Sequence, residues 1–421
     1  MRRAAWLLAA LSLLADARAE DPPVAPPVEP PPPPTDTPPP LPAPRLIGPR
    51  TGPDRKKALQ RYGGNDATEK AVAAGLDWLA RHANERGGWD ADGFPTRCAA
   101  GGAKCEGIGK GQHGEAVACP FDAAVTGLAV LAFLGDGHLP TAPGAAATGS
   151  PSGPYDDLLA KSFQFMEGGD AWAVPIATEA LAEAEAMERK GRFREDVRRR
   201  VEHLLTLRQE DGGWGYAAPW RPGSDVPYSA FVVSALVAAR DAGVELPADL
   251  GKRVDAWLTT LEEHKGRLAY LLDGRKYGYT PTTSNAHCAV AIRELLGSGT
   301  DGARHRTHRA LVSGEKPEWK ISFRDVDVPG RGKVAVQVGN LSMYQWWYGT
   351  VGLFQSGGEA WSGWYGAAKG ALVGHQRKDG CARGSWDPLG TYERQTGGRV
   401  LATALGVLML EQPYRHQRLR P

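Results

Sequence analysis

Hydrophobic and polar residues follow a helical period along most of the chain from about Lys56 onward. Apolar side chains recur every three or four residues, which places them on one side of an α-helix. The pattern predicts about twelve helices. They cover Glu69–Asn84, Asp122–Leu134, Pro154–Met166, Val174–Lys190, Arg194–Arg208, Tyr228–Ala242, Ala248–His264, Ser284–Leu296, Gly302–Val312, Asn340–Phe354, Glu359–His375 and Gly398–Glu411.

Two kinds of helix alternate along the chain. Arg194–Arg208 is amphipathic and heavily charged, as in a helix with one face in solvent. Tyr228–Ala242 is apolar nearly all round until its last turn, as in a helix that is buried on every side. An alternation of half-solvated and fully buried helices indicates two concentric rings, with the apolar helices inside.

One segment departs from the helical period. In Trp319–Val338, the stretches WKISFRDVDV and KVAVQV alternate apolar and polar residues and are joined by PGRG. This pattern predicts a β-hairpin. Because the hairpin precedes an expected inner helix, we expect it to lie at one mouth of the ring.

The charged helices end in a recurring turn, whose clearest copy is RQEDGGWGY at Arg208–Tyr216. Gly212 and Gly213 can take the positive φ angles that reverse the chain, and Trp214 can fold back and bury its ring to fix the turn. Variants recur at Asn84–Phe94, which contains Trp89, at Gly274–Thr280, and at Gln376–Pro388, which contains Trp386. Such internal repetition defines an architecture before any single residue does.

The residues Gln209, Asp211, Gly212, Gly213 and Trp214 resemble the Q-x-D-G-G-W repeat of the prenyltransferase and squalene-hopene cyclase superfamily. The resemblance covers about Thr68 to Tyr414. It implies an all-α fold, the α/α toroid, in which about six helix pairs form two concentric rings around an apolar central cavity. The repeat turns of that family are structural, so they imply the fold and no particular reaction.

The N-terminal region predicts export and a spacer. The first residues, MRRAAWLLAALSLLADARAE, combine two arginines, a short apolar core and a small-x-small cleavage site, so we expect a signal peptide at 1–19. Residues 20–55 are rich in proline and predict an extended, disordered tether. The toroid then occupies 56–421, and the mature protein is expected to be periplasmic or extracellular and not transmembrane.

Net charge argues against one class of ligand, and the cysteine content predicts a disulfide. The net charge of +2 gives no electrostatic footprint for nucleic acid. There are five cysteines, and in an exported protein Cys98 and Cys105 predict a small disulfide loop, leaving at least one free thiol.

Two groups of residues could in principle bind zinc, but the sequence predicts neither as a zinc site. Cys98, Cys105 and Cys119 with His113 do not have the spacing of common zinc ligands. Asp379 and Cys381 with His287 resemble the zinc ligands of protein prenyltransferases, but their order along the chain is reversed and the Asp-x-Cys pair lies in a repeat turn. We therefore expect no metal and no cofactor.

Asp122 and His287 are the catalytic candidates. The resemblance implies that a cyclase would protonate an alkene with an aspartate of a D-x-D-D cluster at an inner-helix start. Here Cys119–Asp122 supplies only the Asp122 carboxylate, and one acid at a helix start is typical of a cap, stabilised as the anion by the helix dipole.

Aromatic residues give the candidate ligand contacts. Tyr344, Trp347 and Tyr348 recur at helical spacings, and Tyr228, His287 and Tyr344 fall in the first turns of inner helices, so their polar tips are expected near one mouth. An aromatic, mostly apolar cavity predicts an apolar or isoprenoid-like ligand, or a peptide, without the acid-cluster reaction. The alternatives are a divergent terpene cyclase or prenyltransferase-like enzyme, and a polysaccharide-active toroid.

Overall fold

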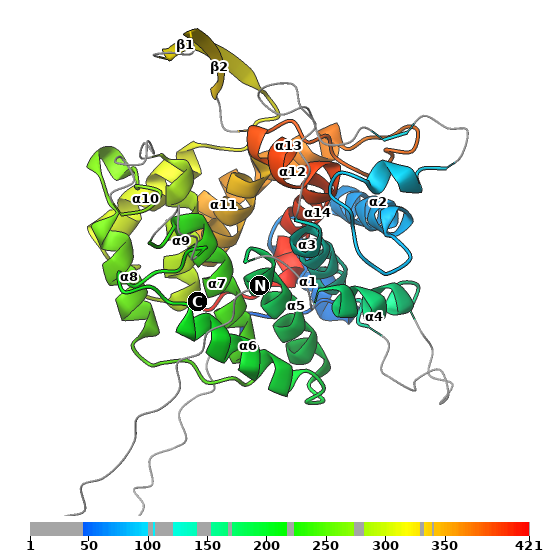
Figure 1. Cartoon of the computed structure of the whole chain (residues 1–421), viewed down its shortest axis with the longest axis horizontal. Coiled ribbons are helices and arrows are strands. Elements are labelled where there is room, and N and C mark those ends of the chain that lie inside the picture. Colours follow the sequence, from blue (N-terminus) through cyan, green and yellow to red (C-terminus); the bar gives the residue numbers. More distant parts are fainter. Residues whose placement is uncertain are drawn as a thin grey trace, which may run out of the picture. The chain divides into compact units, whose positions relative to one another are not determined.

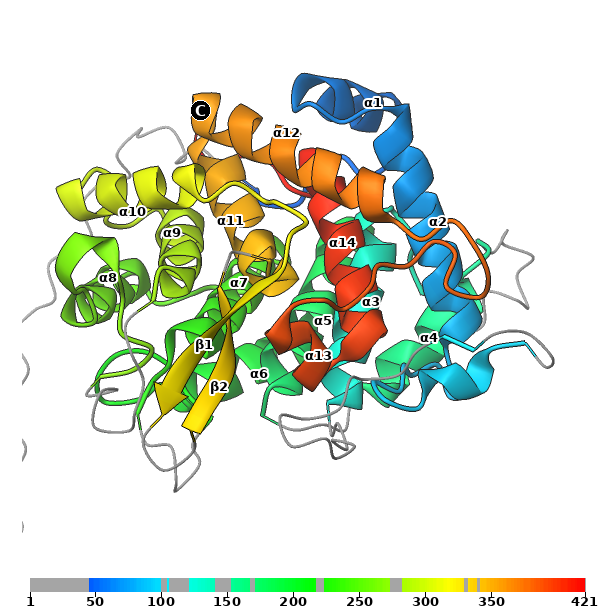
Figure 2. The same ribbon diagram turned by 90° about the horizontal axis from the view of Figure 1, so that it is seen from above.

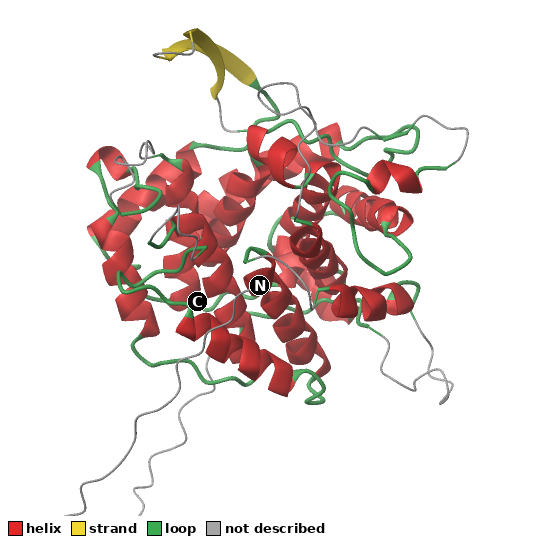
Figure 3. Cartoon of the chain, in the orientation of Figure 1, coloured by secondary structure: helices red, strands yellow, loops and turns green. Residues whose placement is uncertain are grey.

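The structure is a computed structural model that describes residues 45–99, 104–105, 121–140, 153–166, 171–216, 223–272, 282–328, 332–338 and 341–420. The predicted signal peptide, the predicted tether as far as residue 44 and the predicted turn at Gly274–Thr280 lie outside these ranges. The described chain is mainly helical, with one two-stranded hairpin (Figure 3).

Six of the described helices form the inner ring, and each packs against the next. In ring order they are α3 (Asp122–Gly135), α5 (Ala173–Glu188), α7 (Val226–Asp241), α9 (Ser284–Leu296), α11 (Met343–Ser356) and α14 (Gly398–Arg415). Helix α14 packs in turn against α3, which closes the ring. Figure 2, seen from the hairpin side, shows this closed arrangement.

The helices of an outer ring pack against the inner ring (Figure 2). They are α2 (Asp66–His82), α4 (Asp156–Phe165), α6 (Arg194–Thr206), α8 (Leu250–Thr260), α10 (Ala303–Gly314) and α12 (Gly358–His375). The α/α toroid with about six helix pairs is therefore confirmed. The short helices α1 (Gly52–Arg61), α13 (Thr391–Thr396), η1 (Phe94–Arg97) and η3 (His264–Gly266) were not predicted from the sequence.

Burial separates the two rings as the sequence pattern predicts. In α3 every residue from Ala123 to Gly135 is buried, whereas α6 buries only Val197, Val201 and Leu204. Fully burying an aliphatic or aromatic side chain stabilises a fold by about 1.5–3 kcal/mol. The inner helices therefore supply most of the core, while the charged face of α6 pairs its own residues in solvent, as Arg198 does with Glu195 and Glu202.

The repeat tryptophans make the same two hydrogen bonds in all three described turns. Their indole Nε1–H groups donate to an outer-helix carbonyl: Trp89 to Leu79, Trp214 to Leu204 and Trp386 to Leu372, at 2.7–2.8 Å. Their backbone N–H groups donate to an inner-helix hydroxyl: Trp89 to Thr126, Trp214 to Ser229 and Trp386 to Thr403. Each tryptophan thus joins the outer helix before it to the inner helix after it.

The two glycines of the best repeat have different roles, which corrects the sequence prediction. Gly212 has a φ of +107°, so it reverses the chain as predicted. Gly213 has no positive φ, but a Cβ there would lie 2.5 Å from the Trp257 ring of α8. Its missing side chain therefore allows the turn to pack against the next outer helix. Gln209 and Asp211 support the turn, since the Gln209 N–H donates to Gly213 O and the Gly213 N–H donates to Asp211 Oδ1.

The predicted β-hairpin is present. Strands β1 (Ser322–Val328) and β2 (Gly332–Val338) are antiparallel, with Ser322 paired to Val338 and Val328 to Gly332. The hairpin precedes α11 and projects beyond the helices (Figure 1). It therefore marks the end of the ring at which the inner helices begin, here called the mouth.

The other end of the inner ring is covered by the two ends of the described chain. Leu46 and Ile47 are buried, Ile47 forms an antiparallel bridge with His416, and the Ile47 N–H donates to Asp241 at the end of α7. Residues 45–55, which the sequence assigned to the tether, thus pack with the folded part of the chain. No helix among the described residues is both long and apolar enough to cross a membrane.

Candidate functional site

Aromatic side chains from non-adjacent helices of the inner ring meet near the mouth. Phe231 of α7 lies 5.7 Å from Tyr344, 5.6 Å from Trp347 and 5.7 Å from Tyr348 of α11, measured between ring centroids. Helix α9 lies between α7 and α11 in the ring. The contacts therefore lie inside the ring, on the inner side of α9.

Two further rings complete what we call the axial aromatic cluster. Trp172, directly before α5, lies 5.8 Å from Phe231 and 6.5 Å from Tyr392 of α13. Tyr392 lies 4.7 Å from Tyr344. The cluster comprises Trp172, Phe231, Tyr344, Trp347, Tyr348 and Tyr392. Of these, Trp172, Phe231 and Tyr392 were not singled out from the sequence, because contacts across a ring leave no local pattern.

Three polar atoms of this cluster are buried without a hydrogen-bond partner of normal geometry among the described residues. They are the hydroxyls of Tyr344 and Tyr348 and the indole Nε1 of Trp347. Burial raises the pKa of both tyrosines well above the ordinary value, and the neighbouring Cys288 raises it further. Both hydroxyls therefore stay protonated at any physiological pH and can donate a hydrogen bond.

Tyr228 was predicted to contact the ligand, but it has a structural partner. Its hydroxyl donates to Ala171 O at 2.9 Å, and its ring lies 4.8 Å from that of Tyr216. These contacts hold the segment before α5 against the start of α7. Tyr228 thus lies beside the axial aromatic cluster and its hydroxyl is already paired.

Asp122 ties a repeat turn to an inner helix. It is the first residue of α3, yet it caps no N–H group of that helix and accepts instead from the Ala91 N–H at 3.0 Å. Burial, followed by the nearby carboxylates of Asp90 and Asp92, raises its pKa. The expected stabilisation of its anion by the helix dipole is thus outweighed.

His287 does not lie at the mouth among the aromatic tips. It is completely buried, with Nδ1 3.2 Å from Thr283 O, Nε2 3.4 Å from the amide of Gln345, and its ring 5.6 Å from that of Trp364 on α12. Burial lowers its pKa to about 4, so the ring is neutral. His287 therefore packs between the inner and outer rings.

The acids nearest to the aromatic cluster cap helices. The Asp225 carboxylate accepts from the Tyr228 N–H at 2.7 Å, at the start of α7. The buried Glu393 carboxylate accepts from the Tyr344 N–H at 3.0 Å, at the start of α11. Burial raises the pKa of Glu393, while these backbone donors partly offset the rise. Both acids position the segments that carry the aromatic residues.

A layer of charged side chains lies inside the ring farther from the mouth. Arg415 of α14 lies 3.1 Å from Glu179 and 2.8 Å from Glu183, which are both on α5. Arg50 lies 2.7 Å from Glu183, and His416 Nε2 lies 3.5 Å from the same carboxylate. Since α3 separates α5 from α14 in the ring, these ion pairs join two non-adjacent inner helices across its interior. We call Arg50, Glu179, Glu183, Arg415 and His416 the axial charge network.

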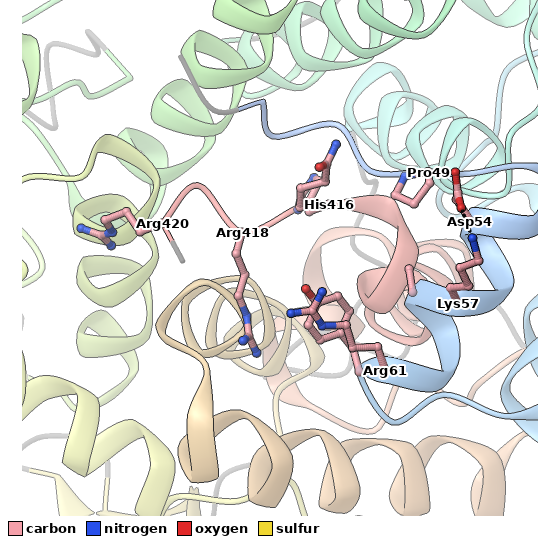
Figure 4. A pocket seen from close by; sticks show the side chains of 10 residues that line it. Pro49, Asp54, Lys57, Arg61, His416, Arg418 and Arg420 are labelled. Atoms are coloured by element: carbon pink, nitrogen blue, oxygen red, sulfur yellow. Dashed lines mark hydrogen bonds and ion pairs between the residues drawn. The ribbon is translucent and has the colours of Figure 1, made fainter. Parts of the chain in front are cut away.

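A surface pocket of about 370 Å³ lies at the end opposite the mouth (Figure 4). Its lining comes mainly from α1 and the C-terminal tail and includes the basic residues Lys57, Arg61, Arg418 and Arg420. Most of these cations already have partners. Lys57 pairs with Asp54, Arg418 donates to Phe354 O, and Arg420 pairs with Glu294. The pocket therefore offers little free charge to a ligand.

The predicted disulfide is not formed. Cys98 and Cys105 are free thiols, and both lie 3.6 Å from His82 Nε2. Cys381, which the sequence placed in a repeat turn, lies 3.4 Å from the same nitrogen. Asp379 pairs with Arg377 in that turn, and His287 is remote from it. Cys119 and His113 lie outside the described residues.

No protein-family model matches the chain, and no curated protein matches it. Among solved structures it is similar to the GH76A α-1,6-mannanase of Salegentibacter sp. HEL1_6, at 10% identity and a TM-score of 0.51, over 83% of this chain and 99% of the mannanase. An inactive variant of that enzyme in complex with α-1,6-mannotriose gives 9% identity and a TM-score of 0.50, over 83% and 99%.

The chain is also similar to the type II terpene cyclase MstE from Scytonema. In the complex of its variant with geranylgeranyl dihydroxybenzoate, the identity is 15% and the TM-score 0.48, over 85% of this chain and 99% of the cyclase. Both kinds of neighbour have the helical toroid fold. At 10% identity, the likeness to the mannanase defines the class of fold, an α/α toroid, and does not extend to the reaction.

Proposed function

We propose that the protein is an exported toroid that binds an apolar, isoprenoid-like ligand against the axial aromatic cluster. The observation that carries this proposal is a set of buried polar groups on α11 that make no hydrogen bond of normal geometry among the described residues. They are the Trp347 Nε1 and the hydroxyls of Tyr344 and Tyr348, which interact with each other and with the Cys288 thiol. An unpaired buried polar group costs about 1–3 kcal/mol. A ligand that adds one hydrogen-bonding group to an apolar body would offset this cost.

The surroundings of these polar groups are suited to a hydrocarbon. Trp172, Phe231 and Trp347 are at most 3% exposed and present aromatic surface from three inner helices or their starts. A site of aromatic walls with a few placed donors is the usual form of a small-molecule site. Tyr344, which is 8% exposed, lies nearer to solvent and gives the direction of entry from the mouth.

The contacts of Asp122 and Glu393 are consistent with a protein that binds its ligand without cyclising it. Asp122 is bonded to the Ala91 N–H, and Glu393 accepts from a helix N-terminus. A cyclase acid must be protonated and must reach the alkene. Asp90 and Asp92 lie near Asp122, but they come from the preceding repeat turn and not from a D-x-D-D run at the start of α3. The divergent cyclase remains the enzyme alternative, with Asp122 as its acid.

A polysaccharide-active toroid is the second candidate, and one observation favours it. The carboxylates of Asp90, Asp92 and Asp122 interact near the start of α3, and both Asp90 and Asp122 have raised pKa values, first because of burial. Glycosidases use two carboxyl groups whose environments differ. A sugar ligand would also use aromatic surface and hydroxyl donors.

The binding test uses the full chain and geranylgeraniol, a long isoprenoid alcohol, with tryptophan fluorescence as the readout. Tyr348→Phe removes only the hydroxyl and should weaken binding by about fivefold to tenfold, which corresponds to one hydrogen bond of about 1 kcal/mol. Phe231→Ala should weaken it further. Tyr365→Phe is the matched control, because Tyr365 is also buried but donates to Leu410 O on the far side of α14.

The outcomes separate the candidates. No binding of geranylgeraniol, or equal binding by wild type and Tyr348→Phe, would contradict the proposal. Saturable binding of α-1,6-mannotetraose in its place, lost in Asp122→Asn, would favour the sugar alternative. Conversion of geranylgeraniol to a cyclic product, abolished in Asp122→Asn, would show that the protein is an enzyme.

A further inference from the structure

Four potential metal ligands from distant parts of the sequence meet beside the outer ring. His82 lies at the end of α2, Cys98 follows η1, Cys105 lies seven residues farther on, and Cys381 belongs to the last repeat turn. The Nε2 atom of His82 and the three sulfurs all lie within 4.8 Å of one another. His82, Cys98 and Cys105 are buried, and Cys381 is half-buried.

The distances are those of a tetrahedral zinc site. The three sulfurs lie 3.6, 3.6 and 3.4 Å from His82 Nε2. With Zn–S bonds of about 2.3 Å and Zn–N bonds of about 2.0–2.1 Å, tetrahedral angles place a sulfur and a nitrogen about 3.5 Å apart. The nitrogen-to-sulfur distances therefore match this geometry, and the three sulfurs lie within 4.8 Å of one another.

The contacts of the ligands orient them toward that point. His82 Nδ1 lies 2.9 Å from Trp78 O, so it carries the proton and leaves the Nε2 lone pair directed at the sulfurs. The ring stacks on Trp78 at 4.2 Å and packs edge-on to Phe94. The Cys105 N–H donates to Cys98 Sγ at 3.2 Å, which is a contact that stabilises a thiolate.

The geometry points to a zinc ion held by His82 and by the thiolates of Cys98, Cys105 and Cys381. Three sulfurs and one imidazole are a common structural zinc set, and they leave no coordination position for a substrate. The three thiols lose their protons when the metal binds. The site is independent of the proposed ligand, since it lies between α2 and the turn after α12 and not on the axis.

The zinc ion would close the toroid. His82, Cys98 and Cys105 belong to the first helix pair and its turn, whereas Cys381 lies in the turn between α12 and α14. Around this junction Gln376 donates to Ala71 O, and Arg81 donates to Cys381 O and Arg383 O. A metal link across so long a stretch of chain restricts the unfolded state strongly and fixes the last repeat to the first.

A disulfide is the competing use of these cysteines in an exported protein. It would consume two sulfurs and leave a third thiol and the oriented imidazole without a partner. The arrangement of all three sulfurs around one ring nitrogen favours the metal.

The test is elemental analysis of the full chain, purified without chelator, together with two variants. Wild type should carry about one zinc ion per chain, and Cys381→Ser should lose it. Cys288→Ala, which changes a buried cysteine on α9 far from the site, should keep the metal. Replacement of zinc by cobalt should give the intense absorption of a tetrahedral cobalt thiolate in wild type and Cys288→Ala, but not in Cys381→Ser.

A strong chelator gives a second measurement that does not depend on whether a variant folds. It should lower the melting temperature of wild type and Cys288→Ala, and zinc should restore it. Absence of metal from wild type, with a Cys98–Cys105 disulfide in its peptide map, would overturn the proposal. Stoichiometric copper in place of zinc would overturn the identity of the metal. None of these outcomes bears on ligand binding at the axial aromatic cluster.

Discussion

The smallest unit that organises this protein is one tryptophan and one hydroxyl. In each described repeat turn, a backbone N–H group of tryptophan donates to a side-chain hydroxyl on the following inner helix, supplied by Thr126, Ser229 or Thr403. The hydroxyl is buried in all three cases. Because a buried N–H group without a partner is costly, the turn and the inner helix stabilise each other.

Replacement of Ser229 tests this pairing. Ser229→Ala leaves the Trp214 N–H without its partner, so we expect the free energy of unfolding to fall by about 1–3 kcal/mol. Ser229→Thr keeps a hydroxyl of the kind found in the other two turns and should lose less. Urea unfolding of the three proteins measures the difference. Equal stability of Ser229→Ala and wild type would show that water or another group replaces the hydroxyl.

At the scale of elements, α5 brings two buried carboxylates, Glu179 and Glu183, against Arg415 of α14. Glu183 is fully buried, but the guanidinium groups of Arg415 and Arg50 outweigh the burial and lower its pKa. Glu179 has only part of this compensation, so burial, aided by the charge of Glu183, raises its pKa to about 7. The two acids on one helix therefore respond to pH in opposite directions.

The difference between these acids predicts how two variants depend on pH. Since the folded pKa of Glu179 is raised, its contribution is greatest below the unfolded value of 4.5 and is lost as pH rises through about 7. Glu179→Gln should therefore gain stability over wild type between pH 5 and pH 8, by up to about 3 kcal/mol. Urea unfolding at both pH values measures this gain, and the groups common to both proteins cancel.

Glu183→Gln is the contrasting variant. The folded pKa of Glu183 is lowered, so its stabilisation is present above the unfolded value and is lost only in acid. Removing this charge leaves Arg50 and Arg415 with less compensation, so Glu183→Gln should be less stable than wild type at pH 8. Similar effects of the two variants at pH 8 would contradict the assigned roles.

At the scale of the whole molecule, the ring depends on segments outside the predicted helices. Arg50 pairs with Glu183, and Arg55 of α1 contacts both Glu69 of α2 and Asp136 at the end of α3. These residues belong to the stretch that the sequence assigned to the tether. They connect the start of the folded chain to the charge network and to the first helix pair.

Two truncations test where the folded domain begins. A chain that starts at Arg45 should unfold like the full chain. A chain that starts at Lys56 loses Leu46, Ile47, Arg50 and Arg55, and breaking the buried pair of Arg50 alone costs about 3–5 kcal/mol. Its melting temperature should fall by more than about 5 °C. Equal melting temperatures would restore the predicted boundary.

The sequence predicted the rings well because periodicity and repeat turns are local signals. Arg194–Arg208 and Tyr228–Ala242 agree with α6 and α7 to within two residues at either end. The hydrogen-bonding role of Trp214 could not be predicted, but its position in a buried turn could. The predicted end of the tether was wrong because its proline content suggested disorder. Leu46 and Ile47 are nevertheless buried, and their burial depends on partners hundreds of residues away in the sequence.

The candidate sites were only partly predictable for the same reason. Tyr344, Trp347 and Tyr348 share a helix and were found from their spacing, whereas Phe231 and Trp172 meet them only across the ring. In the sequence, Cys98 and Cys105 belong to one possible zinc set and Cys381 to another, and His82 belongs to neither. The fold brings these residues together, because closure of the helical ring places Cys381 of the last repeat turn beside His82 of the first outer helix.

The bridge between the chain ends also determines how the toroid bears mechanical force. The Gly48 N–H donates to Arg415 O and the Gln417 N–H donates to Leu46 O, so the two segments run antiparallel and both free ends leave from the same end of this short ladder. A load that pulls the ends apart, once it has stripped Arg418 and Arg420 from α11 and α9, peels the ladder one bond at a time. The helices come under tension only after the ladder has opened. The bridge between the chain ends should therefore be the first part of the ring to yield under force.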